Sequence, residues 1–447
     1  MRSAGSRERG RVRVAGALLA LGLALAGCTN GRTATPPTES PLSGGDVAEP
    51  IGSPPTGRAC SGPLAEEASV CLTTGDAGAV PEGLLQAAYT LVPSPTAAPD
   101  ATQGGPNLST LGADGSLFGS WSPFPQPGGP LLTDPLSIGL YGPDGERSTL
   151  IEESNPGLPA RQAISFSVAG DLAAWVETTS TSLYETDWWI VAYEDGREWI
   201  AAESAELGVG SVLPLVQGDI NVSLAGRTAF WNSPVPGHAQ DQWATALLSR
   251  DVDGGGPIET TADNVWLHTS DGAGSVLFVQ MSADLTERIL SLRPGSEPQV
   301  VVERPGGASA DFAVTALGAD ADTVAWSVWQ GADPDSYLQS DRSWVYVQEV
   351  ATGRLTEIEL NSTGTDAAFV SAGWAAWGNG SGTGDAGEYL LDIRDSVLYR
   401  IAEHEGYSNP VVNYPAVAWA VPNTSPESTL VSLKVAFLTR EAGATSG

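Results

Sequence analysis

The amino-acid sequence predicts an all-β protein built from seven copies of a four-stranded antiparallel unit, and three observations predict it. The chain of 447 residues holds 53 Gly and 32 Pro, so turns are frequent and long helices are disfavoured. A short motif that ends in an aromatic residue recurs every 42 to 56 residues. Between these motifs lie short apolar or alternating runs bounded by turn residues, which is the pattern of β-strands.

The chain begins with a segment that predicts export. Five arginines in the first thirteen residues precede an apolar run at residues 14–26, which is too short to span a bilayer. The run leads into Leu-Ala-Gly-Cys28, which resembles a bacterial lipobox. We interpret residues 1–27 as a lipoprotein signal peptide and Cys28 as the site of acylation, for example with palmitate. An ordinary secretory leader is the alternative. Two acyl chains anchor a protein stably to a membrane where one would not.

Two further segments precede the repeats. Residues 28–58 are rich in Pro, Ser, Thr and Gly and are expected to be a disordered tether. Residues 59–106 form a lead-in that holds Cys60 and Cys71. An even pair of cysteines outside the cytoplasm is expected to form a structural disulfide, which would stabilise by roughly 2.5 to 3 kcal/mol in the chain-entropy model.

The repeated motif is a turn, then small or branched apolar residues, then an aromatic anchor. We expect the small residues to allow neighbouring sheets to approach closely and the aromatic anchors to fill the wedge-shaped space between them. Third strands also tend to begin with an aromatic residue, as at Trp188, Trp243, Trp344 and Tyr389. The seven anchors are Trp121, Trp175, Trp231, Phe278, Trp326, Trp377 and Trp419.

A four-stranded unit repeated at this interval is typical of a β-propeller blade. Seven anchors therefore predict a seven-bladed β-propeller over residues 107–440, with a short tail at 441–447. The last unit ends one strand short. A strand from residues 84–92 is expected to close the ring, with residues 71–74 as the alternative.

The repeat resembles that of the TolB-like propellers, a WD-repeat-like class whose blades carry a polar-Gly-Asp/Asn turn before a short apolar run and an aromatic residue. The sequence Ala-Gly-Asp-Leu-Ala-Ala-Trp at residues 169–175 matches this pattern. The resemblance implies an envelope protein that binds or scaffolds, and it does not extend to the translocation role of TolB. Arginine is used almost to the exclusion of lysine, which fits a lipoprotein of a high-G+C Gram-positive bacterium.

The charge excludes one class of partner. Lys+Arg 21 against Asp+Glu 53 gives a net charge of −32, which repels phosphate backbones, so nucleic-acid binding is not expected. The histidines, at positions 238, 268 and 404, are too scattered for a zinc site or a catalytic triad. The Gly-x-Gly-x-x-Gly at residues 382–387 opens no helix, and residues 251–254 begin like a calcium loop but lack its last acidic ligand. No metal or cofactor is expected.

The candidate ligand face is formed by the long loops between second and third strands. These loops, at residues 180–187, 233–242, 330–343 and 378–387, should surround one mouth of the central channel. Aromatic faces beside carboxylates suit a sugar or a cationic peptide, whereas the alternative is a solvated acidic rim. The candidate residues are Tyr184, His238, Trp329, Tyr337, Asp241, Asp333 and Asp335.

The sequence therefore favours a monomeric, non-enzymatic binding or scaffolding module, anchored through Cys28 to the extracytoplasmic face of the cell membrane and binding an unknown protein or glycan. The alternative is a glycan-active enzyme, a glycosidase or lyase with carboxylates in the channel. Two buried carboxylates that converge in the channel would favour the enzyme. A channel lined by backbone and small residues would favour the binding module.

Overall fold

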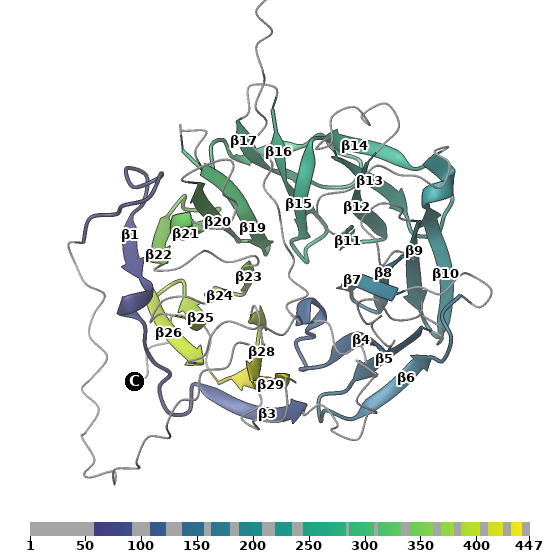
Figure 1. The fold of residues 1–447 in the computed structure, drawn as a ribbon, viewed down its shortest axis with the longest axis horizontal. Helices are drawn as coiled ribbons and strands as arrows, with labels where there is room; N and C mark the ends of the chain where they lie inside the picture. The colour runs from purple at the N-terminus through teal and green to yellow at the C-terminus, as the bar shows by residue number, and fades with distance from the viewer. Residues whose placement is uncertain are drawn as a thin grey trace, which may run out of the picture.

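The protein forms a ring of seven antiparallel sheets, one after another around a central axis (Figure 1). This confirms the predicted seven-bladed β-propeller. The ring is seen in a computed structural model that describes residues 58–91, 108–121, 136–155, 162–178, 187–207, 220–234, 245–282, 286–307, 312–331, 340–360, 368–379, 386–402, 410–422 and 431–439. The expected signal peptide, Cys28, most of the tether and the tail lie outside these ranges. Across the described ranges, we find no helix with the length and apolar character needed to cross a membrane.

Blades 2 to 6 each place four consecutive strands side by side, with the first strand nearest the axis (Figure 1). Blade 2 contains β7 Gln162–Ala169, β8 Leu172–Thr178, β9 Trp188–Glu194 and β10 Arg197–Glu203, followed by the 3-10 helix η3 Ser204–Leu207. Blade 3 contains β11 Val222–Ala225, β12 Thr228–Pro234, β13 Thr245–Asp251 and β14 Glu259–Asp263. Blade 4 contains β15 Val265–Ser270, β16 Val276–Met281, β17 Glu287–Leu292 and β18 Gln299–Val302. Blade 5 contains β19 Phe312–Ala319, β20 Thr323–Gly331, β21 Ser340–Glu349 and β22 Leu355–Leu360. Blade 6 contains β23 Ala368–Ser371, β24 Trp374–Asn379, β25 Gly387–Asp392 and β26 Val397–Ala402.

Tight turns join the first and second strands on one face of the ring. In blade 2, Ala169 pairs with Leu172, so only two residues make the turn, and Gly170 has a φ of 63°. Gly226 takes the corresponding place in blade 3 with a φ of 60°. Glycine adopts this left-handed region at no steric cost, which explains why the turn motif begins with it.

Blade 1 departs from the four-stranded pattern. It has three described strands, β4 Leu117–Trp121, β5 Ser137–Tyr141 and β6 Arg147–Ile151. The 3-10 helix η2 Leu108–Thr110 lies beside β4, where a first strand was expected. The Thr110 Oγ1 accepts from the Phe118 N–H at 2.8 Å and donates to the Phe118 carbonyl at 3.1 Å. The Thr110 side chain thus satisfies both backbone groups of Phe118, which a fourth strand could otherwise have paired.

The ring closes through a segment from the other end of the chain. Blade 7 contains β27 Val411–Asn413, β28 Ala416–Pro422 and β29 Val431–Leu438, and its outer strand is β3 Leu85–Leu91, antiparallel to β29. The strand that the last unit lacks therefore comes from within the predicted closing segment, as β3 Leu85–Leu91.

The part of the lead-in before β3 runs along the outside of blades 5 and 6 (Figure 1). We call the whole described segment, residues 58–91 with β3 included, the strap. Its first strand, β1 Val70–Thr73, adds to β22 in parallel, so the alternative closing segment extends blade 5 instead. The 3-10 helix η1 Thr74–Asp76 follows, and then β2 Gly78–Ala79 adds to β26 in parallel. A disulfide joins Cys60 to Cys71, with their Cα atoms 5.1 Å apart.

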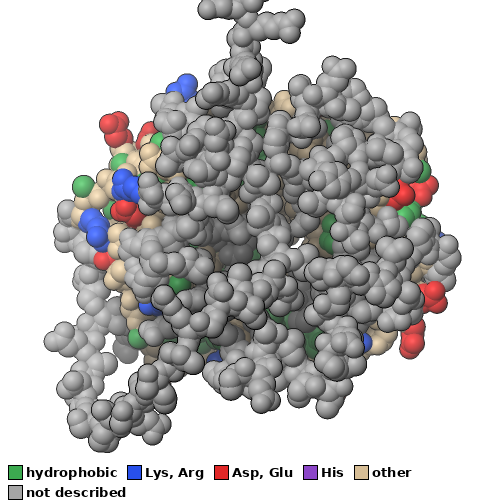
Figure 2. All heavy atoms as spheres, in the orientation of Figure 1, with side chains coloured by type: hydrophobic (Ala, Val, Ile, Leu, Met, Phe, Trp, Pro, Cys, Tyr) green, Lys and Arg blue, Asp and Glu red, His purple; other side chains and the backbone are tan. Residues whose placement is uncertain are grey.

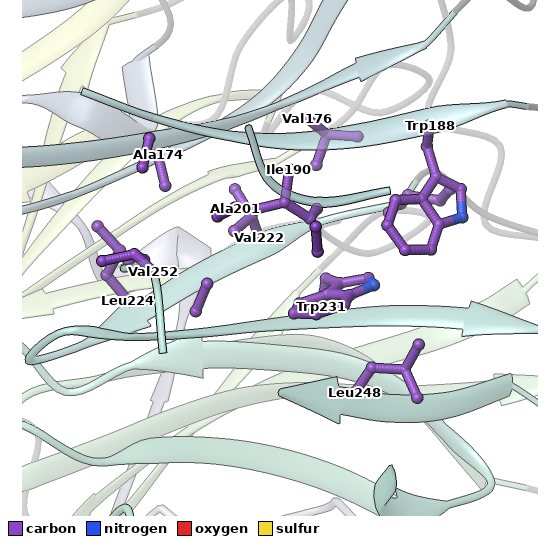
Figure 3. Close-up of a cluster of buried hydrophobic side chains, with 14 of the residues drawn as sticks. Ala174, Val176, Trp188, Ile190, Ala201, Val222, Leu224, Trp231, Leu248 and Val252 are labelled. Carbon is purple, nitrogen blue, oxygen red and sulfur yellow. The ribbon is translucent and has the colours of Figure 1, made fainter. Parts of the chain in front are cut away.

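The aromatic anchors lie between the blades. Trp188 of blade 2 and Trp231 of blade 3 meet edge to face, with ring centroids 5.6 Å apart, among Ala174, Ile190 and Val222 (Figure 3). Small residues such as Ala174 let the sheets approach while the indoles fill the space between them. The side chain of Trp121 is outside the described residues. The other anchors, Trp175, Trp231, Phe278, Trp326, Trp377 and Trp419, are buried.

Side chains also bridge each blade to the next around the axis. In most of these bonds a hydroxyl, carboxylate or amide of one blade meets a backbone group of the next, because neighbouring blades do not share a backbone ladder. Around the ring the bonds are Ser109 to the Phe166 carbonyl, Val222 N to Ser165, Leu224 N to Ser167, Ser223 with His268, Val314 N to Glu287, Ala372 N to Asp320, Tyr414 N to Ser371, and Asn413 to the Leu111 carbonyl.

Candidate functional site

The expected ligand face lies where the second strands end, opposite the tight turns. Of the seven candidate residues, the structure describes Trp329, near the end of β20 and opposite Ser343 in the ladder. Its side chain is partly buried, and its buried Nε1 has no hydrogen-bond acceptor among the residues that the structure describes. The other candidates, Tyr184, His238, Asp241, Asp333, Asp335 and Tyr337, lie outside the described residues.

A layer of buried polar side chains lies directly beneath this face, and the sequence reasoning missed it. Its members sit near the ends of second strands or the starts of third strands, where the ladders approach the long loops. Their spacing from the anchors could have revealed this layer in the sequence, since several of these residues follow an anchor tryptophan by one or two positions. The members of this polar layer are Glu177, Asn232, Ser233, Glu287, Ser343, Asn379 and Glu388.

Glu177 is held by neighbours within the fold. The Trp175 Nε1 donates to its carboxylate at 2.8 Å, and the Ser154 hydroxyl contacts both Glu177 and Glu198. The Asn155 N–H donates to Glu198 at 3.1 Å. Since Glu198 lies on β10, the outermost strand of blade 2, this pair of carboxylates meets between blades 1 and 2 and away from the central axis.

Glu287 bridges blades 4 and 5. Its Oε2 accepts from the Val314 N–H of β19 at 2.9 Å. Burial raises the pKa of Glu287 to about 8, and that hydrogen bond opposes the rise only in part. The side chain is therefore mostly a neutral carboxylic acid at pH 7, tied to the backbone of the next blade.

His268 is the titratable side chain of the described inner strands. Its Nδ1 lies 2.9 Å from the Ser223 Oγ of the neighbouring inner strand, β11. Burial lowers the pKa of His268 to about 4, so the imidazole is neutral at pH 7. This hydrogen bond joins blade 3 to blade 4 and is one of the side-chain bonds that connect neighbouring blades around the axis.

The wall around the axis is formed by first strands of low polarity. The described inner strands β7, β11, β15, β19, β23 and β27, together with η2, carry no Asp, Glu, Lys or Arg. Their residues are mostly Ala, Val, Leu, Ser and Thr. Within the part of the wall that is described, a pair of carboxylates facing the axis is therefore absent.

Metal-ligand clusters are also absent from the described residues, where no three His, Cys, Asp or Glu side chains converge. The segment that begins like a calcium loop is a turn after β13. In it Asp251 accepts from the Asp253 N–H at 2.9 Å, and Arg227 pairs with the Asp253 carboxylate at 2.7 Å. Its acidic side chains already have partners.

The protein is therefore a β-propeller in which the described interior side chains pack between the blades or form hydrogen bonds from one blade to the next. No protein-family model matches the sequence, and no curated protein matches it. Among solved structures, the chain is similar to the WD40 domain of Neurospora crassa Pan2, with a TM-score of 0.44 and 10% identity, covering 81% of this chain and 98% of that one. It is also similar to a prolyl endopeptidase (TM-score 0.44, 10% identity, 76% of this chain) and to Pyrococcus horikoshii acylaminoacyl peptidase (TM-score 0.42, 11% identity, 68% of this chain). This chain covers 51% and 47% of those two peptidase chains, about half of their length.

Figure 2 adds the distribution of charge on one face. Among the described side chains in this view, the acidic and basic groups gather at the outer rim of the ring. Several charged side chains of the described residues form ion pairs: Arg227 pairs with Glu194 and Asp253, Arg288 with Glu303, and Arg354 with Glu349.

Proposed function

We propose that this protein is a lipid-anchored propeller of the TolB-like class that binds or scaffolds a protein or glycan at the extracytoplasmic face of the cell membrane, without catalysing a reaction. The observation that carries the proposal is the uncharged character of the described inner strands. Glycosidases need carboxylates on both sides of the scissile bond, and the carboxylates that meet at Ser154 lie between two blades instead.

Membrane attachment is tested at the acylated cysteine. In the full chain, Cys28→Ser removes the thiol that would carry the lipid, so the protein should leave the membrane fraction and lose incorporation of radiolabelled palmitate. Thr29→Ser is the matched control, because it changes the adjacent residue and keeps the thiol. Unchanged membrane attachment of the Cys28→Ser protein would contradict lipid anchoring.

Binding is tested with the full chain on a glycan array and in pull-down experiments. Trp329→Ala removes the described aromatic residue of the ligand face and should weaken binding of the ligand recovered with the unaltered protein. Trp199→Ala, on the outer strand of blade 2, is the control and should leave binding unchanged. Release of reducing or unsaturated sugar from a bound glycan would refute the non-enzymatic proposal and favour the glycan-active alternative.

A further inference from the structure

The strap carries a short loop, residues 60–69, that docks on the outer edge of blade 5. The backbone N–H groups of Ser61 and Gly62 donate to Glu357 Oε1 at 2.7 and 2.9 Å. Glu357 is almost fully buried, on β22, and its other oxygen accepts from the Tyr346 hydroxyl at 3.1 Å. A buried carboxylate thus holds two consecutive N–H groups of the loop, and charge-assisted bonds of this kind are among the stronger hydrogen bonds in proteins.

The docking surface is selective for the residues that occupy it. A Cβ on Gly62 would lie 2.1 Å from the Tyr346 hydroxyl and 2.8 Å from the Glu357 carboxylate, so only glycine fits without displacing buried groups. Two residues further, Leu64 is buried in the core shared by blades 4 and 5, beside Val328 and Trp344. The sequence Ser-Gly-Pro-Leu at residues 61–64 therefore fits this edge residue by residue. The N–H groups of Ser61 and Gly62 bind a carboxylate, the Tyr346 hydroxyl leaves no room for a side chain at position 62, and Leu64 enters an apolar site.

The loop is held by two different means. One is the set of contacts with blade 5, which also includes the Ser61 hydroxyl donating to Glu359 at 2.8 Å. The other is the Cys60–Cys71 disulfide, which ties the start of the loop to β1. Both cysteines are partly exposed, so a dithiol can reach the bond. The disulfide restricts the undocked loop much more than the docked one, because it closes a ring of only about a dozen residues.

We propose that the blade 5 edge formed by Trp344, Tyr346 and Glu357 is a peptide-binding surface occupied by the protein's own residues 60–69, and that reduction of the Cys60–Cys71 disulfide opens it to an extended segment of another protein with the same small-Gly-Pro-apolar chemistry. In the reduction, a dithiol attacks one sulfur, its second thiol resolves the mixed disulfide, and two electrons and two protons pass to the cysteines. The dithiol leaves as its own disulfide. In an oxidising compartment the surface is closed by default.

The first experiment is hydrogen exchange of the full chain, with and without dithiothreitol. Reduction should speed exchange of the Ser61, Gly62 and Leu64 amides about a hundredfold, which is the entropic effect of a cross-link over a loop of this length. Amides of β8 and β12 should be unchanged. A Cys60→Ser, Cys71→Ser double variant should reproduce the effect without reductant. Unchanged exchange of the loop, or faster exchange throughout the ring, would overturn the proposal.

The second experiment supplies the segment from outside. A fluorescent synthetic peptide of residues 58–69, with serine in place of cysteine, should bind the reduced chain and the double variant at least tenfold more tightly than the oxidised chain. The same peptide with alanine at the position of Gly62 should not bind, because its methyl group meets the Tyr346 hydroxyl. Glu357→Gln in the double variant should weaken binding of the glycine peptide. Equal binding to oxidised and reduced chains, binding of the alanine peptide, or no binding after reduction would each overturn the proposal. A dimer of the reduced chain that excludes the peptide would show that the surface takes a second copy instead.

Discussion

Glu287 shows how a single buried side chain can make the contact between two blades depend on pH. A carboxyl that must stay neutral inside the fold ionises freely when the chain unfolds, so its protonation changes with folding. The Val314 N–H that it accepts belongs to the inner strand of the next blade. The contact between blades 4 and 5 therefore depends on the protonation state of this residue.

The pH dependence follows from the direction of that pKa shift. The pKa of Glu287 is about 8 in the folded chain and lies near the ordinary value of 4.5 once unfolded. Between these values the unfolded chain has lost a proton that the folded chain keeps, so stability falls as pH rises through this window, by up to about 1.4 kcal/mol per pH unit. Glu287→Gln should remove this component, and urea denaturation at pH 5, 6, 7 and 8 measures it. Glu297→Gln, at an exposed position of the same blade, is the control. Parallel pH curves for the unaltered and Glu287→Gln proteins would contradict the prediction.

At the scale of elements, the tryptophan-ended second strand is the repeated packing device. Trp231 is fully buried against Trp188 of the preceding blade. Replacing it with alanine removes the buried indole and leaves a cavity between the two sheets. We expect Trp231→Ala to lower the free energy of unfolding by about 3 to 5 kcal/mol in chemical denaturation. Trp199→Ala, at a partly buried outer-strand position, should cost distinctly less. Equal losses would mean that the anchors are not the main packing groups.

Inner strands approach more closely than outer strands, and one glycine makes this possible in blade 5. A Cβ at Gly318 of β19 would lie 2.1 Å from the Ala368 carbonyl oxygen of β23, so the backbones of neighbouring blades are almost in contact there. Gly318→Ala should force the two strands apart and destabilise the chain by about 1 to 3 kcal/mol or more. Gly255→Ala, where an added methyl meets nothing within 4 Å, is the control. A melting temperature for Gly318→Ala that matches the control would refute the close approach.

The same elements show what the sequence could and could not predict. Strands such as β8 were predictable, because a glycine turn, small residues and a tryptophan fall in a fixed order along the chain. The helix η2 was not, since the bonds that Thr110 makes to Phe118 depend on a partner eight residues away that carries no pattern of its own. A strand at residues 71–74 was considered only for closing the ring, and its parallel pairing with blade 5 was not predicted. The strand β2 was not predicted either, because two residues show no period and its pairing is set by a distant sheet.

The candidate site divides in the same way. The position of Trp329 beside a long loop between second and third strands was predictable, whereas the buried polar layer beneath that face was not. A polar residue at a strand end normally signals exposure, and only the neighbouring blade decides that Glu177 and Glu287 are enclosed. The lack of charged residues in the inner strands could be seen in the sequence only after these strands were known to surround the axis. The structure of the ring was needed to show that position.

On the scale of the whole molecule, the strap joins the beginning of the described chain to its end. It supplies the outer strand of blade 7 and additional strands to blades 5 and 6, so three neighbouring blades depend on residues that precede the first blade. In blade 7, β3 comes from the opposite end of the chain and covers the edge that β29 would otherwise expose. We expect this closure to make unfolding of the blades cooperative, because the ring cannot open between blades 7 and 1 unless the strap also detaches.

Deleting residues 58–91 from the full chain should therefore open the ring at a defined place. Leu64, Leu72 and Leu84 are strap residues buried against the blades, and the loss of their burial alone should cost about 5 kcal/mol or more. Hydrogen exchange should speed most in β29, which loses its partner strand β3, then in β22 and β26, which lose β1 and β2, and least in blades 2 and 3. Deleting residues 30–57, a segment of similar length in the expected tether, should leave exchange in all seven blades unchanged. If the two deletions have equal effects, or if β29 keeps its protection without the strap, then the strap is an accessory to the ring and not its closure.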